Sequence, residues 1–161
     1  MKKLRIREQM EKYYPPGREL KKDLCFYRIG LWCAVGYSCL FTVEYKMSWY
    51  SLHTFGKNGK LVVIDGAMMP SFAEMVSGYL NGFYLLAILM LEAILFNYWY
   101  HRKGSKSVYI MKRLPNPWEY HKRCITLPLL GAINAIIMAG LMMLVYYGIY
   151  MHNTPAQCMP L

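Results

Sequence analysis

The sequence predicts an all-α integral membrane protein with three transmembrane helices, an N-terminal interfacial helix and a small extracellular hairpin loop. Composition is the first reason: 56% of the 161 residues are hydrophobic, only 17% are charged, and the mean hydropathy is +0.16. The second reason is that charge largely avoids three apolar windows, 24–45, 71–100 and 124–150. Each window supplies the ~20 residues that cross ~30 Å of hydrocarbon at ~1.5 Å per residue.

The basic residues predict the orientation of the chain. Eight Lys or Arg precede the first window and seven lie in segment 101–123, whereas loop 46–70 has three and tail 151–161 has none. Basic segments stay on the cytoplasmic side. We therefore expect a multi-pass plasma-membrane protein with a cytoplasmic N-terminus and an extracellular C-terminus. The net charge of +10 then faces anionic lipid, and we expect no nucleic-acid partner.

Segment 1–23 precedes the first window and is strongly basic. Its stretch Lys2–Tyr13 carries Leu4, Ile6 and Met10 on one side, which favours an amphipathic helix lying on the inner membrane surface. Pro15-Pro16-Gly17 then breaks the chain before the first span. The alternative is a frayed basic tail, and the pattern favours neither one over the other.

Loop 46–70 predicts a β-hairpin on the outer side. Its strands, Ser51–Phe55 and Leu61–Asp65, flank the turn Gly56–Lys60, whose Asn-Gly pair accepts positive φ angles. Ser71 and Glu74 then form a capping-box pattern that opens the second span. We interpret the loop as a compact connector rather than a docking site.

Each span carries small residues at four-residue spacing, which places them on one helix face. Such faces let membrane helices approach closely. The predicted packing residues are Gly30, Ala34 and Ser38 in the first span, Gly78 and Gly82 in the second, and Gly131, Ala135 and Ala139 in the third. Aromatic residues that include Tyr45, Tyr146 and Tyr150 are predicted to mark the outer membrane interface.

Four polar residues inside the predicted spans are candidates for a structural role. Arg28 and Glu92 are at similar depth, so one hypothesis is an ion pair between the first two helices. The alternative is that Arg28 extends to the inner interface and Glu92 faces an aqueous cavity. Asn81 and Asn134 are expected to form hydrogen bonds between helices.

Cysteine and histidine spacing predicts no metal site, no haem, no other cofactor and no disulfide. Of the five cysteines, Cys25, Cys33 and Cys39 lie in or beside the first span, and no CxxC pair occurs. The four histidines show no ligand spacing. An enzyme would also need titratable groups that converge at one depth, and no such set is identifiable.

Segment 101–123 is the most informative part of the chain. A hydrophobic strip leads to Leu114-Pro115, and a short element after Pro117 carries Trp118, Glu119 and Tyr120. Glu119 lies near the start of this element, where the helix dipole favours a carboxylate. The element leads directly into the third span, so it can transmit force from a soluble partner. The alternative is a basic loop fastened to lipid headgroups.

This Leu-Pro-x-x-x-x-Glu pattern with a following basic residue resembles the cytoplasmic coupling segment of ABC-2 type ABC transporter permeases. In that family the segment joins the second and third transmembrane helices and docks against the ATPase. The order of elements is also similar to the first half of such a permease. The resemblance implies that Leu114, Pro115 and Glu119 contact an ATPase subunit, with Trp118 and Tyr120 as anchors.

The chain departs from that family in length and in chemistry. The permeases usually have six spans, and this chain has three predicted spans. It also lacks a Gly-x-x-x-x-Gly-Lys-Ser/Thr phosphate loop, so ATP hydrolysis would belong to a partner. We therefore expect a membrane subunit that works with an ATPase and further permease chains. The alternative is a small structural or regulatory subunit of another membrane complex.

Overall fold

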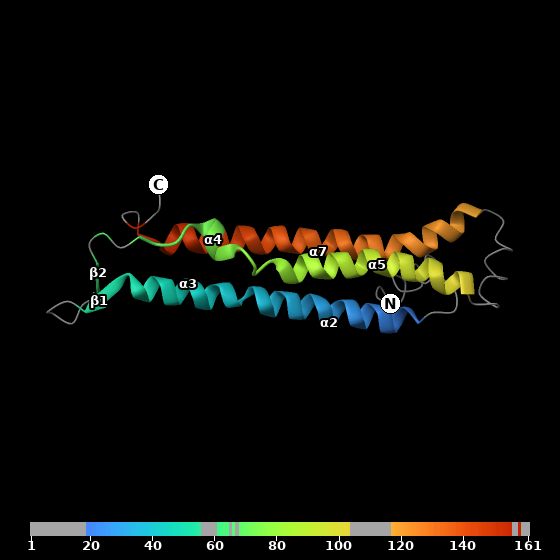
Figure 1. Ribbon diagram of the computed structural model, residues 1–161, viewed down its shortest axis with the longest axis horizontal. Coiled ribbons are helices and arrows are strands. Elements are labelled where there is room, and N and C mark those ends of the chain that lie inside the picture. The colour runs from blue at the N-terminus through green and yellow to red at the C-terminus, as the bar shows by residue number, and fades with distance from the viewer. Residues whose placement is uncertain are drawn as a thin grey trace, which may run out of the picture.

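The computed structural model consists of three long helical stretches that lie side by side (Figure 1). It describes residues 19–55, 61–64, 66, 68–103, 117–155 and 158. Segment 1–18 with its expected interfacial helix, the hairpin turn 56–60, and Leu114 and Pro115 of the coupling segment lie outside these residues.

Three helical stretches are long and apolar enough to cross a membrane: Leu20–Ser51, Asn81–Tyr100 and Trp118–Asn153. Because each is a continuous apolar helix of membrane-spanning length, the chain is a membrane-spanning protein of mainly helical structure. The first and third stretches extend beyond windows 24–45 and 124–150 at both ends.

The first stretch consists of α2 (Leu20–Ser38) and α3 (Leu40–Ser51). They meet at Cys39, whose φ of −63° and ψ of −17° stay right-handed, so the helix axis continues through the junction. At this junction the Val35 carbonyl accepts hydrogen bonds from the Cys39 N–H (3.0 Å) and from the Ser38 hydroxyl (2.9 Å). The junction therefore keeps its polar groups paired inside the span.

The second predicted span, 71–100, is not one helix. The chain forms a short helix α4 (Phe72–Val76), a turn, and then α5 (Asn81–Lys103). Gly78 in the turn has φ of +96°, a left-handed conformation that interrupts a right-handed helix. The capping box between Ser71 and Glu74 is confirmed, but it opens α4 rather than the span.

The loop after α3 contains a two-stranded antiparallel sheet of β1 (His53–Phe55) and β2 (Leu61–Val63). His53 pairs with Val63, and the Ile64 N–H donates to the Leu52 carbonyl at 2.9 Å. This small sheet extends beyond the end of α3 (Figure 1).

The third stretch is a single helix, α7 (Pro117–Asn153), with Pro128 inside it. It runs parallel to α2 and α3, and α5 runs antiparallel to them along the part of the bundle where α2 begins (Figure 1). Cys158 follows α7 and is buried, with its carbonyl accepting a hydrogen bond from the Met69 N–H at 3.0 Å. Cys158 therefore lies against the loop before α4, at the end of the bundle that carries the hairpin.

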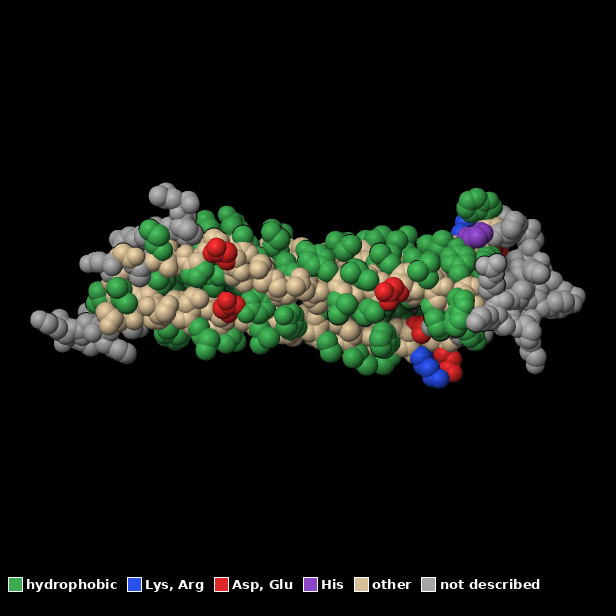
Figure 2. Space-filling model, in the orientation of Figure 1, with side chains coloured by type: hydrophobic (Ala, Val, Ile, Leu, Met, Phe, Trp, Pro, Cys, Tyr) green, Lys and Arg blue, Asp and Glu red, His purple; other side chains and the backbone are tan. Residues whose placement is uncertain are grey.

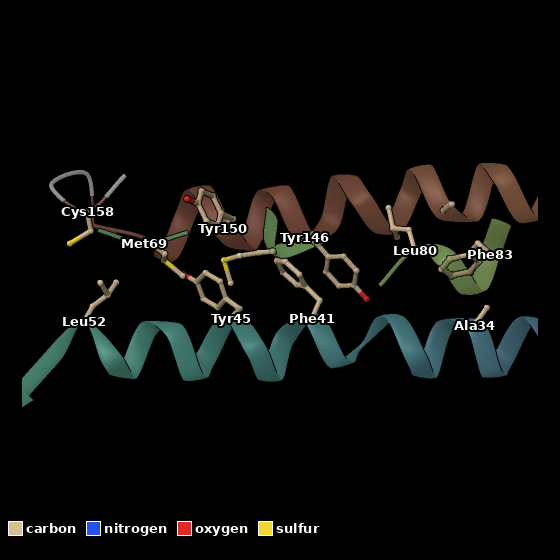
Figure 3. Packing of buried hydrophobic residues seen from close by; sticks show 12 residues of the cluster. Ala34, Phe41, Tyr45, Leu52, Met69, Leu80, Phe83, Tyr146, Tyr150 and Cys158 are labelled. Atoms are coloured by element: carbon tan, nitrogen blue, oxygen red, sulfur yellow. The ribbon is translucent and has the colours of Figure 1, made fainter. Parts of the chain in front are cut away.

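The hairpin end of the bundle, called the outer half below, has a large aromatic core (Figure 3). Phe41 and Tyr146 stack with their ring centroids 4.6 Å apart, and both are almost fully buried. Tyr45, Tyr146 and Tyr150 were expected at a lipid interface, but they lie in this core, each at most 5% exposed. The expectation was wrong because these tyrosines lie on the helix faces that meet within the bundle.

Each of these tyrosine hydroxyls is hydrogen-bonded to another segment. Tyr146 donates to the Ser38 hydroxyl at 2.9 Å, and Tyr150 donates to the Pro70 carbonyl at 3.0 Å. The Tyr45 and Thr154 hydroxyls lie 3.1 Å apart. Near them Tyr79 donates to Glu44, and this hydrogen bond is the main cause that raises the pKa of Tyr79. A buried hydroxyl with a partner costs little, so the outer core combines packing with polar pairing.

The outward faces of the helices are apolar. Figure 2 shows hydrophobic side chains along the length of the molecule, with isolated acidic side chains among them. Trp32, Leu95 and Leu144 are among the most exposed hydrophobic residues. Such a surface suits contact with lipid or with other membrane chains.

Replacing Phe41 with Ala should lower the free energy of unfolding by ~1–3 kcal/mol. The stack on Tyr146 and the filled core volume are lost, whereas lipid supplies little additional hydrophobic transfer energy. The matched control is Trp32→Ala, because Trp32 is 70% exposed. Thermal unfolding in one detergent measures both, and equal losses for the two variants would contradict the assignment of the core.

Candidate functional site

The inner half of the bundle, at the end where α2 begins, contains a cavity of about 380 Å³ between α2, α5 and α7. Most of its lining is apolar, with residues such as Leu24, Met90 and Leu127. Four lining side chains carry polar groups: Asp23, Tyr27, Asn97 and Asn134. In the outer half aromatic rings fill the core, and a further pocket at that end is lined by residues of α3 and α7 that include Trp49 and Ile149.

Pro128 shapes the cavity wall formed by α7. Proline has no N–H, so the carbonyl of Cys124, four residues earlier, loses its donor within the helix. The Asn97 side-chain amide from α5 donates to that carbonyl at 3.1 Å, and both residues are buried. A carbonyl without a partner in a lipid-surrounded bundle would cost free energy, so this bond satisfies the proline site and joins α5 to α7.

A second polar connection joins α2 to α7 across the cavity. The Tyr27 hydroxyl donates to the Gly131 carbonyl at 3.2 Å and accepts a hydrogen bond from the Asn134 amide at 2.8 Å. Asn134 thus has a partner on another helix, as expected from its place in the span. Asn81 differs: its side chain is exposed at the start of α5, and it makes no interhelical hydrogen bond within the described residues.

Most of the small residues lie where helices approach closely. A Cβ atom on Gly82 would come within 3.2 Å of the Ala34 backbone, and one on Gly30 within 2.8 Å of the Leu86 side chain. A Cβ atom on Gly131 would come within 3.1 Å of the Met90 sulfur. Ser38, Ala135 and Ala139 are buried.

Gly78 is the exception among the predicted packing residues. It lies in the turn before α5, and a Cβ there would meet nothing within 4 Å. Its role is the left-handed turn, so its assignment to a packing stripe was wrong.

The hypothesised ion pair between Arg28 and Glu92 is not formed. Both side chains are exposed, and no ion pair joins them in the part of the chain that the structure describes. The contacts of Gly82 with Ala34 and of Gly30 with Leu86 set the register of the two antiparallel helices. This register places Glu92 level with residue 24, which is ~6 Å from the level of Arg28 along the axis. The two residues also lie away from the α2–α5 contact.

The inner ends of α5 and α7 are held together by aromatic side chains. The Tyr98 hydroxyl lies 2.8 Å from Nδ1 of His121, and the rings of Tyr98 and Tyr120 pack edge to face. Glu119 is 3.9 Å from Arg123 one turn later, and Trp118 is largely exposed. Thus Trp118, Glu119 and Tyr120 lie in the first turn of the helix that forms the third span.

The side chains that could bind a metal or form a disulfide are dispersed through the described residues. Among them, no group of three His, Cys, Asp or Glu lies close enough to hold a metal ion. Cys25, Cys33, Cys39, Cys124 and Cys158 are free thiols. The sequence analysis did not predict the hydrogen bond that Asn97 supplies near Pro128, nor the cavity beside these residues. A proline inside an apolar window signals a carbonyl that needs a donor, but the sequence does not say which side chain supplies it.

Comparison with protein-family models, with curated proteins and with solved structures finds no match to the chain. The functional argument therefore rests on the geometry of the helices, the cavity and the inner ends.

Replacing Asn97 with Leu should destabilise the protein by ~1 kcal/mol, because the Cys124 carbonyl loses its donor. In a Pro128→Ala background the helix N–H at position 128 becomes available, so the same replacement should cost much less. A double-mutant cycle in thermal or denaturant unfolding measures the difference. Additive losses at the two positions would contradict the assigned role of Asn97.

Proposed function

We propose that the chain is a membrane-spanning subunit of a multi-subunit ABC transporter, acting with separate ATPase and permease chains. Segment 104–123 would couple ATP hydrolysis in the partner to movement of the helices. The observation that carries the proposal is the continuity of α7, whose 37 residues run from Pro117 to Asn153. At ~1.5 Å per residue the helix is ~55 Å long, longer than the hydrocarbon layer is thick.

A continuous helix transmits displacement because its backbone hydrogen bonds resist bending. At Pro128, where α7 lacks one of these bonds, the hydrogen bond from Asn97 to the Cys124 carbonyl ties α7 to α5. Trp118, Glu119 and Tyr120 form its first turn, so a force on them acts on the span directly. The contact between Tyr98 and His121, 2.8 Å apart, makes α5 follow the same movement. Hydrogen bonds from Tyr146 to Ser38 and from Tyr150 to Pro70 tie the other end of α7 to the outer half. In this proposal the inner end is therefore the end that moves.

The surface of this first turn suits a protein partner. Trp118 is 68% exposed, and the Glu119 side chain is 43% exposed with a cation one turn away. Tryptophan, tyrosine and arginine are the residues enriched at the energetic centres of protein interfaces, and Trp118, Tyr120 and Arg123 lie together here. Because the chain has no phosphate-binding loop, the partner would supply the nucleotide site.

The first test is purification of the tagged native complex in mild detergent with mass spectrometry of the co-purifying chains. An ATPase subunit and further membrane chains should appear with the wild type. Glu119→Lys should reduce the recovered ATPase about tenfold or more, because charge reversal removes the carboxylate and faces Arg123 with a like charge.

Glu19→Lys is the matched control for this experiment. Glu19 is an exposed acid at the start of α2 that pairs with Lys22 at 3.1 Å, so the charge change is the same on a different helix. It should leave the ATPase recovery unchanged. Recovery of the tagged chain without other proteins, or with a complex that has no ATPase, would contradict the transporter proposal. It would favour a small structural or regulatory subunit.

We also propose that the inner half faces the cytoplasm, which puts the N-terminus inside and the C-terminus outside. The distribution of Lys and Arg supports this orientation. An alkaline phosphatase fused after Leu161 should be active, and a green fluorescent protein at the same point should stay dark. The reverse pattern would contradict the orientation and would place segment 104–123 away from any cytoplasmic ATPase.

A further inference from the structure

We infer that Arg28 and Glu92 form an ion pair between two copies of this chain, so that the protein associates with itself inside the membrane. This inference goes beyond the transporter proposal and holds whether or not an ATPase binds the chain. It rests on the depth of the two charges, on their lack of partners among the described residues, and on the faces of the bundle that they occupy.

Both charged side chains lie inside apolar helical stretches. Arg28 is ~12 Å along the helix from Leu20, and Glu92 is ~12 Å from Tyr100, which are the inner ends of these two stretches. One turn from Glu92 on the same helix face, Ile88 is 52% exposed and Leu95 is 70% exposed. Because these apolar side chains face lipid, water does not solvate the carboxylate between them. Ionisable residues at such depth are rare in membrane proteins, and they are usually paired.

Neither charge has a partner among the residues that the structure describes. Both side chains are exposed, and the ion pairs formed in this part of the chain, Lys22 with Glu19 and Arg123 with Glu119, involve neither of them. Neither residue lines the inner cavity, so that space does not solvate them. Because one chain presents both a base and an acid in its membrane-spanning part, a second copy supplies the complement of each.

The depths of the two charges suit a pair between copies. All copies share one orientation in the membrane, so a rotation about the membrane normal relates them and each residue keeps its depth. The contact of Gly82 with Ala34 sets a register in which Glu92 lies ~6 Å nearer the inner end than Arg28. Side chains lean toward the N-terminus of their helix, which is the inner end for α2 and the opposite end for α5. Arg28 therefore leans inward and Glu92 leans outward, which brings the two charged groups closer in depth.

The two charges lie on different faces of the bundle. Gly30 of α2 faces α5, Tyr27 lies ~60° further around the helix and bonds to α7, and Arg28 lies ~100° beyond Tyr27 in the same sense. Arg28 is therefore on the outer face that α2 shares with α7. Gly82 of α5 faces α2, and Glu92 lies ~80° beyond it, on the outer face that α5 shares with α2. A pair between copies thus joins two different surfaces, which is the kind of interface that builds rings.

Charge reversal with exchange between copies tests the pair. Two versions of the full chain with different tags are expressed together, and the recovery of one tag with the other is measured in mild detergent. Arg28→Glu in both versions, or Glu92→Arg in both, should lower this recovery at least about fivefold, because like charges then meet at the interface. Arg28→Glu in one version with Glu92→Arg in the other should restore it, because every contact between the two versions again joins opposite charges.

Two further reversals serve as matched controls. Lys22→Glu and Glu19→Arg make the same two charge changes at exposed positions at the inner end of α2, where these side chains pair with each other. Each should leave the recovery of one tag with the other unchanged.

Photo-crosslinking in the chain with its natural charges covers the case in which a charge-reversed chain does not fold. A benzoylphenylalanine in place of Ile88, one turn from Glu92, should crosslink to segment 24–35 of a second copy. The same side chain in place of Ile133 is the control, because Ile133 is also exposed and lies at a similar depth. It lies ~160° around α7 from Gly131, which bonds to α2, so it should crosslink at least about fivefold less.

Unchanged recovery in the two single variants would overturn the inference, as would losses equal to those of the control reversals. If the exchanged pair of variants is not recovered, the crosslink from position 88 decides: its presence supports the inference and its absence overturns it. A crosslink to a different membrane protein would also overturn it, because that protein would then be the partner. The outcome does not depend on recovery of an ATPase, so the two proposals can fail separately.

Discussion

The hydrogen bond from the Asn97 amide to the Cys124 carbonyl, 3.1 Å long, is the interaction on which the inner half of the protein depends. Pro128 removes the helix donor from that carbonyl, and in a bundle surrounded by lipid no water replaces it. The bond lets α7 continue as one helix past a proline and ties it to α5 at the same point. The cavity, with Pro128 and Asn97 in its wall, and the attached inner ends follow from this arrangement.

Packing changes in character along the bundle. The outer half is filled by aromatic rings, with Phe41 against Tyr146, and its tyrosine hydroxyls are paired with other segments. In the middle, Gly30, Gly82 and Gly131 allow close contact between helices. The inner half holds a cavity of about 380 Å³. Beside this cavity, hydrogen bonds from Asn97 to the Cys124 carbonyl and from Tyr27 to the Gly131 carbonyl still join the three helices.

The sequence predicts the number of spans because hydropathy over 20 residues depends only on composition. It does not predict the break at Gly78, since a glycine in an apolar window suits both a packing face and a left-handed turn. The prediction of an ion pair between Arg28 and Glu92 was wrong because the position of a residue in the sequence gives only its approximate depth. It does not give the register of two helices or the faces on which they meet. The Tyr27–Asn134 bond and the cavity depend on contacts between residues more than 100 positions apart. Such contacts are set by the tertiary packing alone.

The proposed coupling requires that the inner half moves while the outer half stays fixed. Pulsed electron–electron resonance tests it most directly, with nitroxide-bearing unnatural side chains in the native complex in nanodiscs. One pair replaces Lys22 and Lys122 at the inner end, and the other replaces Lys46 and Tyr147 at the outer end, all at exposed positions. We predict that adding nucleotide shifts the inner distance and leaves the outer distance unchanged. An unchanged inner distance, or an outer distance that shifts as much, would contradict the account.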